Sequence, residues 1–156
     1  FSMFWQGVAK RDLWLDGPMF WGISGGEWQS TGLKEHLDYY RPENTTSVFG
    51  PNTNAYFPKM YMSKDMNQKV QTRYLQNGAY ARLKNIQLGY TFPTQIINKL
   101  HMQKLRVYVS AENVLTITSL PSGFDPETTY SNYSDGNSGK TYPLQTTISF
   151  GLNATF

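Results

Sequence analysis

Cysteine is absent from the 156-residue chain, which excludes a disulfide framework and any zinc site built on thiolates. Long apolar runs are absent as well, since no stretch approaches the roughly 18 residues that a transmembrane helix needs. Charge is scarce at 16% of residues, the net charge is only +3, and Lys and Arg are scattered rather than gathered into a stripe. The sequence therefore gives no support to nucleic-acid binding.

Aromatic residues, in contrast, make up 15% of the chain, and Tyr alone occurs 11 times. This composition favours an all-β protein with long polar loops over a helical one. The sequence opens at Phe1 without an initiator methionine or a signal peptide. We expect it to be a piece of a longer protein.

The segment 144–156, LQTTISFGLNATF, alternates apolar and polar residues with a period of two, which predicts a β-strand with one apolar face. The strand ends on an aromatic residue, Phe156, as the closing strand of an outer-membrane β-barrel does. A strand of an ordinary soluble sandwich fits the same alternation, and this segment alone leaves the two interpretations about even.

Three further segments predict strands, at 1–9, 80–92 and 105–118. If the sheet lies in a membrane, the apolar faces of these strands and of 144–156 contact lipid, and the opposite faces, which include Arg106 and Glu112, line a lumen. Arg82 and Lys84 extend the apolar face of the second strand and are expected at the headgroups. The predicted lipid-facing residues are Ile86, Leu88, Tyr90, Phe92, Val107, Val109, Ile148, Phe150 and Leu152.

The connections between these strands differ greatly in length. If 144–156 runs toward the periplasm, strand parity places the long loops 10–79 and 119–143 outside the cell and the short turn 93–104 in the periplasm. Long outer loops and short inner turns are typical of bacterial outer-membrane barrels. Within the first loop, 31–40 favours one short helix.

The sequence resembles the C-terminal part of SusC/RagA-type TonB-dependent outer-membrane transporters of Bacteroidetes. The resemblance rests on segments that occur in the order expected for that family. They are YARLKNIQLGYTFP at 80–93, RVYVSAENVLTIT at 106–118, GFDPE at 123–127, YP at 142–143, SFGLNATF at 149–156 and, in a loop, NAYFPK at 54–59.

This resemblance implies an all-β fold, in which the chain forms about four C-terminal strands of a large transmembrane antiparallel β-barrel of about 22 strands. It also implies an outer-membrane importer of oligosaccharides or peptides, which works with a SusD-like lid lipoprotein and is energised through the TonB system. By resemblance to outer-membrane proteins in general, Phe156 belongs to the signal read by the barrel-assembly machinery. Plug and TonB box lie outside this chain, and the residues do not separate a glycan importer from a peptide importer.

Few residues suggest chemistry. Asp125, Glu127 and Asp135 share one loop and form a weak calcium candidate, although DPE is a natural turn sequence and the spacing matches no calcium loop. Paired carboxylates also occur in glycosidases, but solvated loop carboxylates are far commoner. His36 and His101 have no ligand-spaced partners. We expect no catalysis, no cofactor and no established metal site.

Aromatic side chains in the first loop are the remaining candidates for function. They suit contacts with a lid protein or cargo, but packing within the loop is the commoner use of such residues. The candidates are Trp14, Trp21, Trp28, Tyr39, Tyr40 and Tyr56.

Two other architectures fit parts of the pattern. One is a small stand-alone outer-membrane barrel, which needs about eight strands. The other is a secreted carbohydrate-binding β-sandwich, which would bury Ile86, Leu88, Phe150 and Leu152 under a second sheet.

Overall fold

The computed structural model describes residues 1–25, 32–61, 66–129, 139 and 141–156. The chain divides into two compact units. The sheet unit comprises Phe1–Arg11, Ala79–Ser119 and Leu144–Phe156, and the loop unit comprises Asp12–Gly78 and Leu120–Pro143. Within the described ranges, no helix is long and apolar enough to cross a bilayer.

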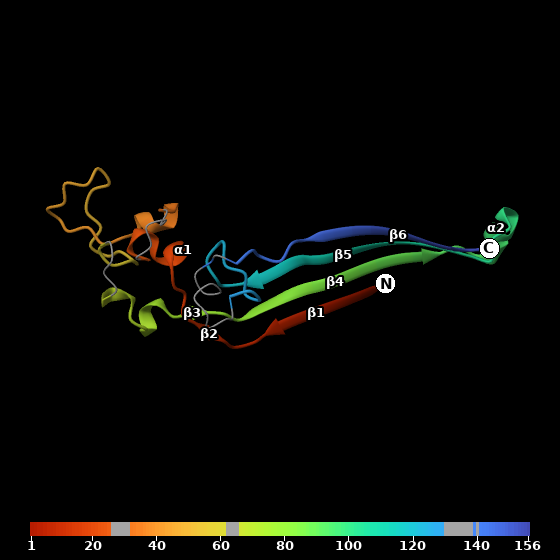
Figure 1. Ribbon diagram of the computed structural model, residues 1–156, viewed down its shortest axis with the longest axis horizontal. Helices are drawn as coiled ribbons and strands as arrows, with labels where there is room; N and C mark the ends of the chain where they lie inside the picture. Colours follow the sequence, from red (N-terminus) through yellow and green to blue (C-terminus); the bar gives the residue numbers. More distant parts are fainter. Residues whose placement is uncertain (26–31, 62–65, 130–138, 140) are drawn as a thin grey trace. The chain divides into compact units, whose positions relative to one another are not determined.

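The sheet unit is one antiparallel sheet of four strands, arranged in the order β1-β4-β5-β6 (Figure 1). The strands are β1 (Ser2–Val8), β4 (Tyr80–Thr91), β5 (Lys104–Thr118) and β6 (Thr147–Thr155). β4 and β5 are long enough for the tilted crossing of a bilayer, which takes about 9–11 residues. This sheet confirms the predicted fold class of about four antiparallel strands, and it is open within the described residues.

Residues paired across the sheet form alternating apolar and polar rows. Leu88 pairs with Val109, which pairs with Phe150, and the next row of the same kind joins Tyr90, Val107 and Leu152. The rows between them are polar or small, because Gln87, Ser110 and Ser149 pair in one and Gly89, Tyr108 and Gly151 in another. Side chains alternate between the two sides of a strand, so the sheet has an apolar face and a polar face.

A β-bulge at Lys84 interrupts this alternation in β4. Phe4 pairs with Asn85 but Trp5 pairs with Leu83, so β4 carries one extra residue relative to β1. Because β1 continues its own alternation, Trp5 and its partner Leu83 lie on the apolar face, and Gln6 and its partner Arg82 lie on the polar face. The bulge thus keeps the apolar face continuous although the sequence parity changes.

This register corrects the expectation that Arg82 extends the apolar face. Arg82 is only 3% exposed, and its Nε donates to Thr116 Oγ1 at 2.7 Å within a polar row. A parity rule carried across the bulge without the extra residue would place Arg82 on the wrong side of the sheet.

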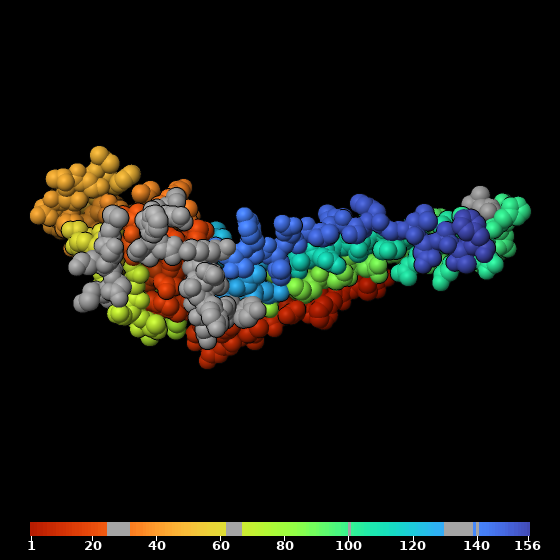
Figure 2. Space-filling view, in the orientation of Figure 1, coloured from red at the N-terminus to blue at the C-terminus, as the bar shows by residue number. Residues whose placement is uncertain are grey.

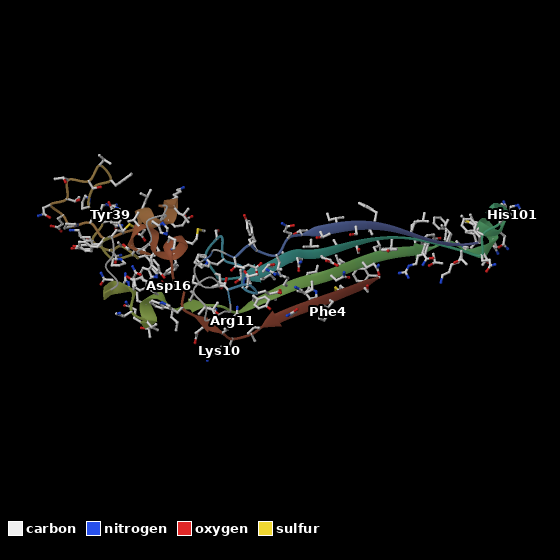
Figure 3. The ribbon with its side chains drawn as sticks, in the orientation of Figure 1. Phe4, Lys10, Arg11, Asp16, Tyr39 and His101 are labelled. Atoms are coloured by element: carbon white, nitrogen blue, oxygen red, sulfur yellow. The ribbon has the colours of Figure 1, made fainter. Side chains whose placement is uncertain are left out.

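The turn between β4 and β5 is compact. Pro93 precedes α2 (Thr94–Ile97), whose last residue is buried, and the 3₁₀ turn η5 (Asn98–Leu100) follows. His101 ends this turn in the left-handed region, at φ 56°. In Figure 3, His101 lies at one end of the sheet unit, and Lys10 and Arg11 lie at the other.

The loop unit contains only short elements. β2 (Asp12–Leu13) pairs with β3 (Gln76–Asn77), and the described helical turns are all of three or four residues. In place of the predicted helix over 31–40, the described residues form a single 3₁₀ turn, η2. The turns are α1 (Pro18–Trp21), η1 (Gly22–Gly25), η2 (Lys34–Leu37), η3 (Met66–Gln68) and η4 (Thr72–Tyr74).

An aromatic core holds the loop unit together in the absence of long elements. Trp21 lies at its centre and contacts Phe20, Phe57 and Tyr74 edge to face, with ring centroids 4.9–6.3 Å apart. Its indole Nε1 donates to the Leu15 carbonyl at 3.2 Å, so the one polar atom of the ring is satisfied. The buried members are Leu15, Phe20, Trp21, Phe57, Tyr74, Leu120 and Phe124.

Candidate functional site

The apolar face of the sheet leaves large side chains uncovered. Phe150 is 85% exposed and Ile148 is 63% exposed, and Figure 2 shows β6, in blue, at the surface of the sheet unit. A run of exposed Ile, Leu, Phe and Tyr side chains is unstable against water over such an area, but it suits hydrocarbon.

Of the nine sequence-predicted lipid-facing residues, eight lie in apolar rows of the sheet. Ile86 pairs with Ala111, which pairs with Ile148, so that row is apolar as well. Phe92 lies just beyond the end of β4, where its ring packs edge to face on Tyr90 at 5.1 Å. Sequence reasoning missed Leu83 and its partner Leu115 on the same face, and for Leu83 the reason is that the bulge changes the parity of β4.

Tyr108 lies on the polar face, in a row with two glycines. Its neighbours in the row are Gly89 and Gly151, and a Cβ on Gly151 would overlap the Tyr108 ring. The ring therefore lies across β6 in space that only glycine leaves open. Arg106 and Asn153 belong to the adjacent polar row with Thr91, and Glu112 pairs with Asn85 and Thr147.

Phe156 follows the last residue of β6, and its side chain is 76% exposed. The strand is held up to this point, because the Gln103 amide donates to the Thr155 carbonyl at 2.8 Å and Lys104 pairs with Thr155. The ring is thus presented at the end of a paired strand rather than packed into the sheet unit.

The structure separates the loop aromatics into a buried and a more accessible group. Trp21 is 1% exposed, so its ring serves the core of the loop unit and is not available to a partner. Trp14 and Tyr56 are partly buried against this core, Tyr39 packs against it beneath the Arg41 guanidinium, and Tyr40 is exposed. Trp28 lies outside the described residues.

Arg41 is a structural residue that sequence reasoning missed. It is buried, its Nε donates to the Gly50 carbonyl at 2.6 Å, and its Nη1 donates to the Leu37 carbonyl at 2.7 Å. Its backbone also pairs with Asn52. These bonds close the segment 42–49, which exposes Val48 and Phe49. An isolated Arg in a polar loop carries no sequence signal for such a role.

A pocket of about 390 Å³, called here the loop pocket, opens within the loop unit. Its wall is largely apolar and includes Phe20, Tyr56 and Phe57, and its polar groups include Glu35, His36 and Asp38 from η2 and the residue after it. The other lining residues are Met19, Leu33, Gln76, Pro121 and Ser122.

His36 lines the loop pocket and also packs against the buried core of the loop unit. Its side chain is 5% exposed, its Nδ1 accepts from the Leu33 amide at 2.9 Å, and its ring packs on Phe57. Gly22, at φ 60°, passes so close that a Cβ there would lie 3.0 Å from Nδ1. Because Nδ1 is an acceptor, the neutral ring carries its proton on Nε2.

The carboxylates near GFDPE form a turn. Asp125 is buried, its Oδ1 accepts from the Glu127 amide at 2.8 Å, and its carbonyl accepts from the Thr129 amide and hydroxyl. Among the described residues, no group of three His, Cys, Asp or Glu side chains could hold a metal ion. Asp135, the third member of the calcium candidate, lies outside those residues.

Comparison with known proteins gives the family. No protein-family model matches the chain. TonB-dependent receptor P3 of Formosa agariphila is 36% identical over 112 residues, which make up 67% of this chain and 11% of that protein. The receptors P39 and P26 of the same organism are 28% and 25% identical over 76% and 100% of the chain. The chain belongs to the TonB-dependent receptor family.

Solved structures of a peptide transporter share the fold of this chain. The RagAB peptide importer in its open-open state aligns with 99% of this chain at a TM-score of 0.61 and 25% identity. A RagAB peptide transporter structure aligns at a TM-score of 0.63 and 23% identity, which shows the shared fold. As a TonB-dependent receptor segment of the Bacteroidetes type, the chain is part of an outer-membrane β-barrel.

The chain spans 11% to 15% of the length of these TonB-dependent receptors and solved transporters. The relatives are receptors and transporters rather than enzymes, in keeping with a chain for which catalysis is not expected.

Proposed function

We propose that this chain supplies four wall strands and outer loops of an outer-membrane nutrient importer. The observation that carries the proposal is the exposed apolar face of the sheet unit in a chain related over most of its length to TonB-dependent receptors. In this arrangement the apolar face contacts lipid and the polar face, with Arg82, Tyr108 and Arg106, contacts the barrel interior.

The orientation follows from loop length. The loop unit, with the connections 10–79 and 119–143, faces the outside of the cell, and the short turn 93–104 lies in the periplasm. The long connections form a unit with a buried core of its own, which suits loops that carry contacts. The compact turn from Pro93 to Gln103 suits the periplasmic side.

The working importer includes a SusD-like lipoprotein that covers the outer mouth, and it takes energy from the TonB system through parts of the longer protein. Its cargo is an oligosaccharide or a peptide. The name of the RagAB peptide importer supports the peptide alternative, since that protein aligns with nearly the whole chain.

A first experiment tests the barrel. Outer membranes from the native source are run on a gel with and without boiling, and the protein is detected with an antibody to 119–143. We expect a band several times the 17.9 kDa of this chain whose mobility changes on boiling. A soluble band at the mass of the chain would favour the carbohydrate-binding sandwich, and a heat-modifiable band at that mass would favour the small stand-alone barrel.

A second experiment tests transport. Deletion of the full-length gene should reduce uptake of labelled peptides or of labelled oligosaccharides, and the cargo that is lost identifies the substrate class. Purification of the full-length receptor tests the proposed partner, because a SusD-like lipoprotein should co-purify with it. Unchanged uptake of both cargo types would overturn the importer proposal.

The role of Phe156 in barrel assembly stays a prediction. Deleting Phe156 in the full-length receptor should lower the amount of heat-modifiable barrel in the outer membrane, whereas Phe156→Tyr, which keeps the aromatic ring, should not. Equal surface levels for all three proteins would contradict it.

A further inference from the structure

We propose that the loop pocket binds the side chain of a basic residue, arginine or lysine, in a peptide cargo. This inference rests on the proposed import function and narrows it to a substrate class and a site.

The charge of the pocket points to a cation. Among the described lining residues, the acidic and basic side chains are Glu35, His36 and Asp38, and none is a Lys or an Arg. Glu35 is exposed, and its carboxylate makes no hydrogen bond within the part of the chain that the structure describes. An anionic ligand, such as a sulfated or uronic-acid glycan, would meet repulsion here, while an ammonium or guanidinium group is attracted.

The hydrogen-bonding groups on this side of the pocket are acceptors. Asp38 accepts from the Asn52 amide at 2.8 Å and from the Tyr56 backbone at 3.1 Å, and both bonds fix its carboxylate in place. Gln76 donates to the Tyr56 hydroxyl and to the Tyr74 carbonyl, which leaves its side-chain oxygen as an acceptor. Lysine ammonium and arginine guanidinium carry only donors, so either group matches this set.

The apolar wall suits the stem of such a side chain. Phe20 and Phe57 are almost fully buried and contact each other edge to face at 5.6 Å, so these two rings expose little surface for stacking. Sugar rings need an exposed aromatic face for stacking, whereas the methylene stem of lysine or arginine packs on any apolar wall. The geometry therefore favours a basic side chain over a sugar.

His36 adds a donor beside the acceptors. The ring is almost fully buried and lines the pocket, Nδ1 is occupied by the Leu33 amide, and Nε2 has no hydrogen-bond partner among the described residues. The Nε2 proton can be accepted by a carbonyl oxygen of the bound peptide. A basic residue in a peptide can thus make two kinds of contact with the pocket. Its side chain binds the carboxylates, and its main-chain carbonyl accepts from His36.

The test uses the purified full-length receptor, together with any lipoprotein that co-purifies. Two blocked tripeptides serve as probes, Ala-Arg-Ala and Ala-citrulline-Ala, which differ in charge but hardly in shape. We expect the arginine peptide to bind about tenfold or more tightly than the citrulline peptide, the size of one charge-assisted hydrogen bond, and this preference to shrink at high salt.

Glu35→Gln tests whether the preference for the arginine peptide arises at the loop pocket. It should remove most of the preference for the arginine peptide while leaving citrulline-peptide binding and the heat-modifiable barrel band unchanged. The matched control is Glu43→Gln, which removes a carboxylate that is also exposed but does not line the pocket, and it should change nothing.

Equal binding of the two peptides, no binding of either, or a preference that survives Glu35→Gln would overturn the inference. None of these results affects the importer proposal, which is judged by uptake in the deletion strain. Loss of uptake on gene deletion together with a charge preference insensitive to Glu35 would retain the importer and reject this pocket.

Discussion

The sheet unit and the loop unit treat their apolar side chains in opposite ways. The sheet unit presents Ile148, Phe150 and Leu152 on an open face, while the loop unit gathers Trp21, Phe57 and other rings into a buried core. The sheet unit has long regular strands with few buried side chains, whereas the loop unit has a dense core with almost no regular structure. One is organised for an apolar surrounding and the other for water, within the same chain.

Trp21→Ala should cause the largest loss of stability, and this loss should be confined to the loop unit. Removing a fully buried indole costs about 3–5 kcal/mol, and it also removes the hydrogen bond to the Leu15 carbonyl. Limited proteolysis of the full-length receptor in outer membranes should show rapid cleavage within 12–78, with the heat-modifiable barrel band retained. Tyr40→Ala, at an exposed ring, is the control. Loss of the barrel band itself would show that the two units do not fold separately.

Ile148→Arg tests the sheet unit in the same way. If Ile148 contacts lipid near the middle of the membrane, an Arg there costs about 2–4 kcal/mol, so the folded barrel should be strongly reduced. Thr147→Arg is the matched control, because the adjacent residue lies on the polar face, paired with Glu112. The measurement is the fraction of heat-modifiable protein in isolated outer membranes. Similar losses for both variants would contradict the face assignment.

Gly151→Ala should have a smaller effect that stays within the sheet unit. The added methyl group meets the Tyr108 ring, and such overpacking costs about 1–3 kcal/mol. Urea unfolding of the purified barrel should shift to lower urea concentration. When Tyr108→Ala has already removed the ring, Gly151→Ala should lower stability by less than it does in the wild-type protein. Strictly additive losses would mean that the ring does not depend on this glycine.

The strands could be predicted from the sequence because one side of each strand is apolar over several residues, and a period of two is a local signal. The bulge at Lys84 could not, because it depends on the pairing of Trp5 with Leu83, which are far apart in the sequence. The family resemblance also came from local segments, such as 80–93 and 149–156, and the comparisons confirm it.

The loop unit was much harder to predict. Its core joins Leu15 and Trp21 to Phe57, Tyr74 and Phe124 across long sequence separations, and no periodicity marks these positions. The aromatic residues alone could indicate either packing or contact with a partner. For Trp21 burial decides in favour of packing, and the loop pocket beside it arises from the same long-range contacts.

Val48→Arg should have the smallest effect. It introduces an Arg at an exposed apolar position of the loop unit, as Ile148→Arg does in the sheet unit. Val48 is 94% exposed in the segment that Arg41 closes, so by exposure it resembles Ile148. If the loop unit lies in water, Val48→Arg should change stability by no more than about 0.5 kcal/mol, with an unchanged barrel band and unchanged proteolysis of 12–78. Exposure alone would predict equal outcomes for Val48→Arg and Ile148→Arg. If Val48→Arg is tolerated and Ile148→Arg is disruptive, the two units lie in different surroundings, water for the first and lipid for the second. A disruptive Val48→Arg would show that this segment is also covered, by lipid or by a partner protein.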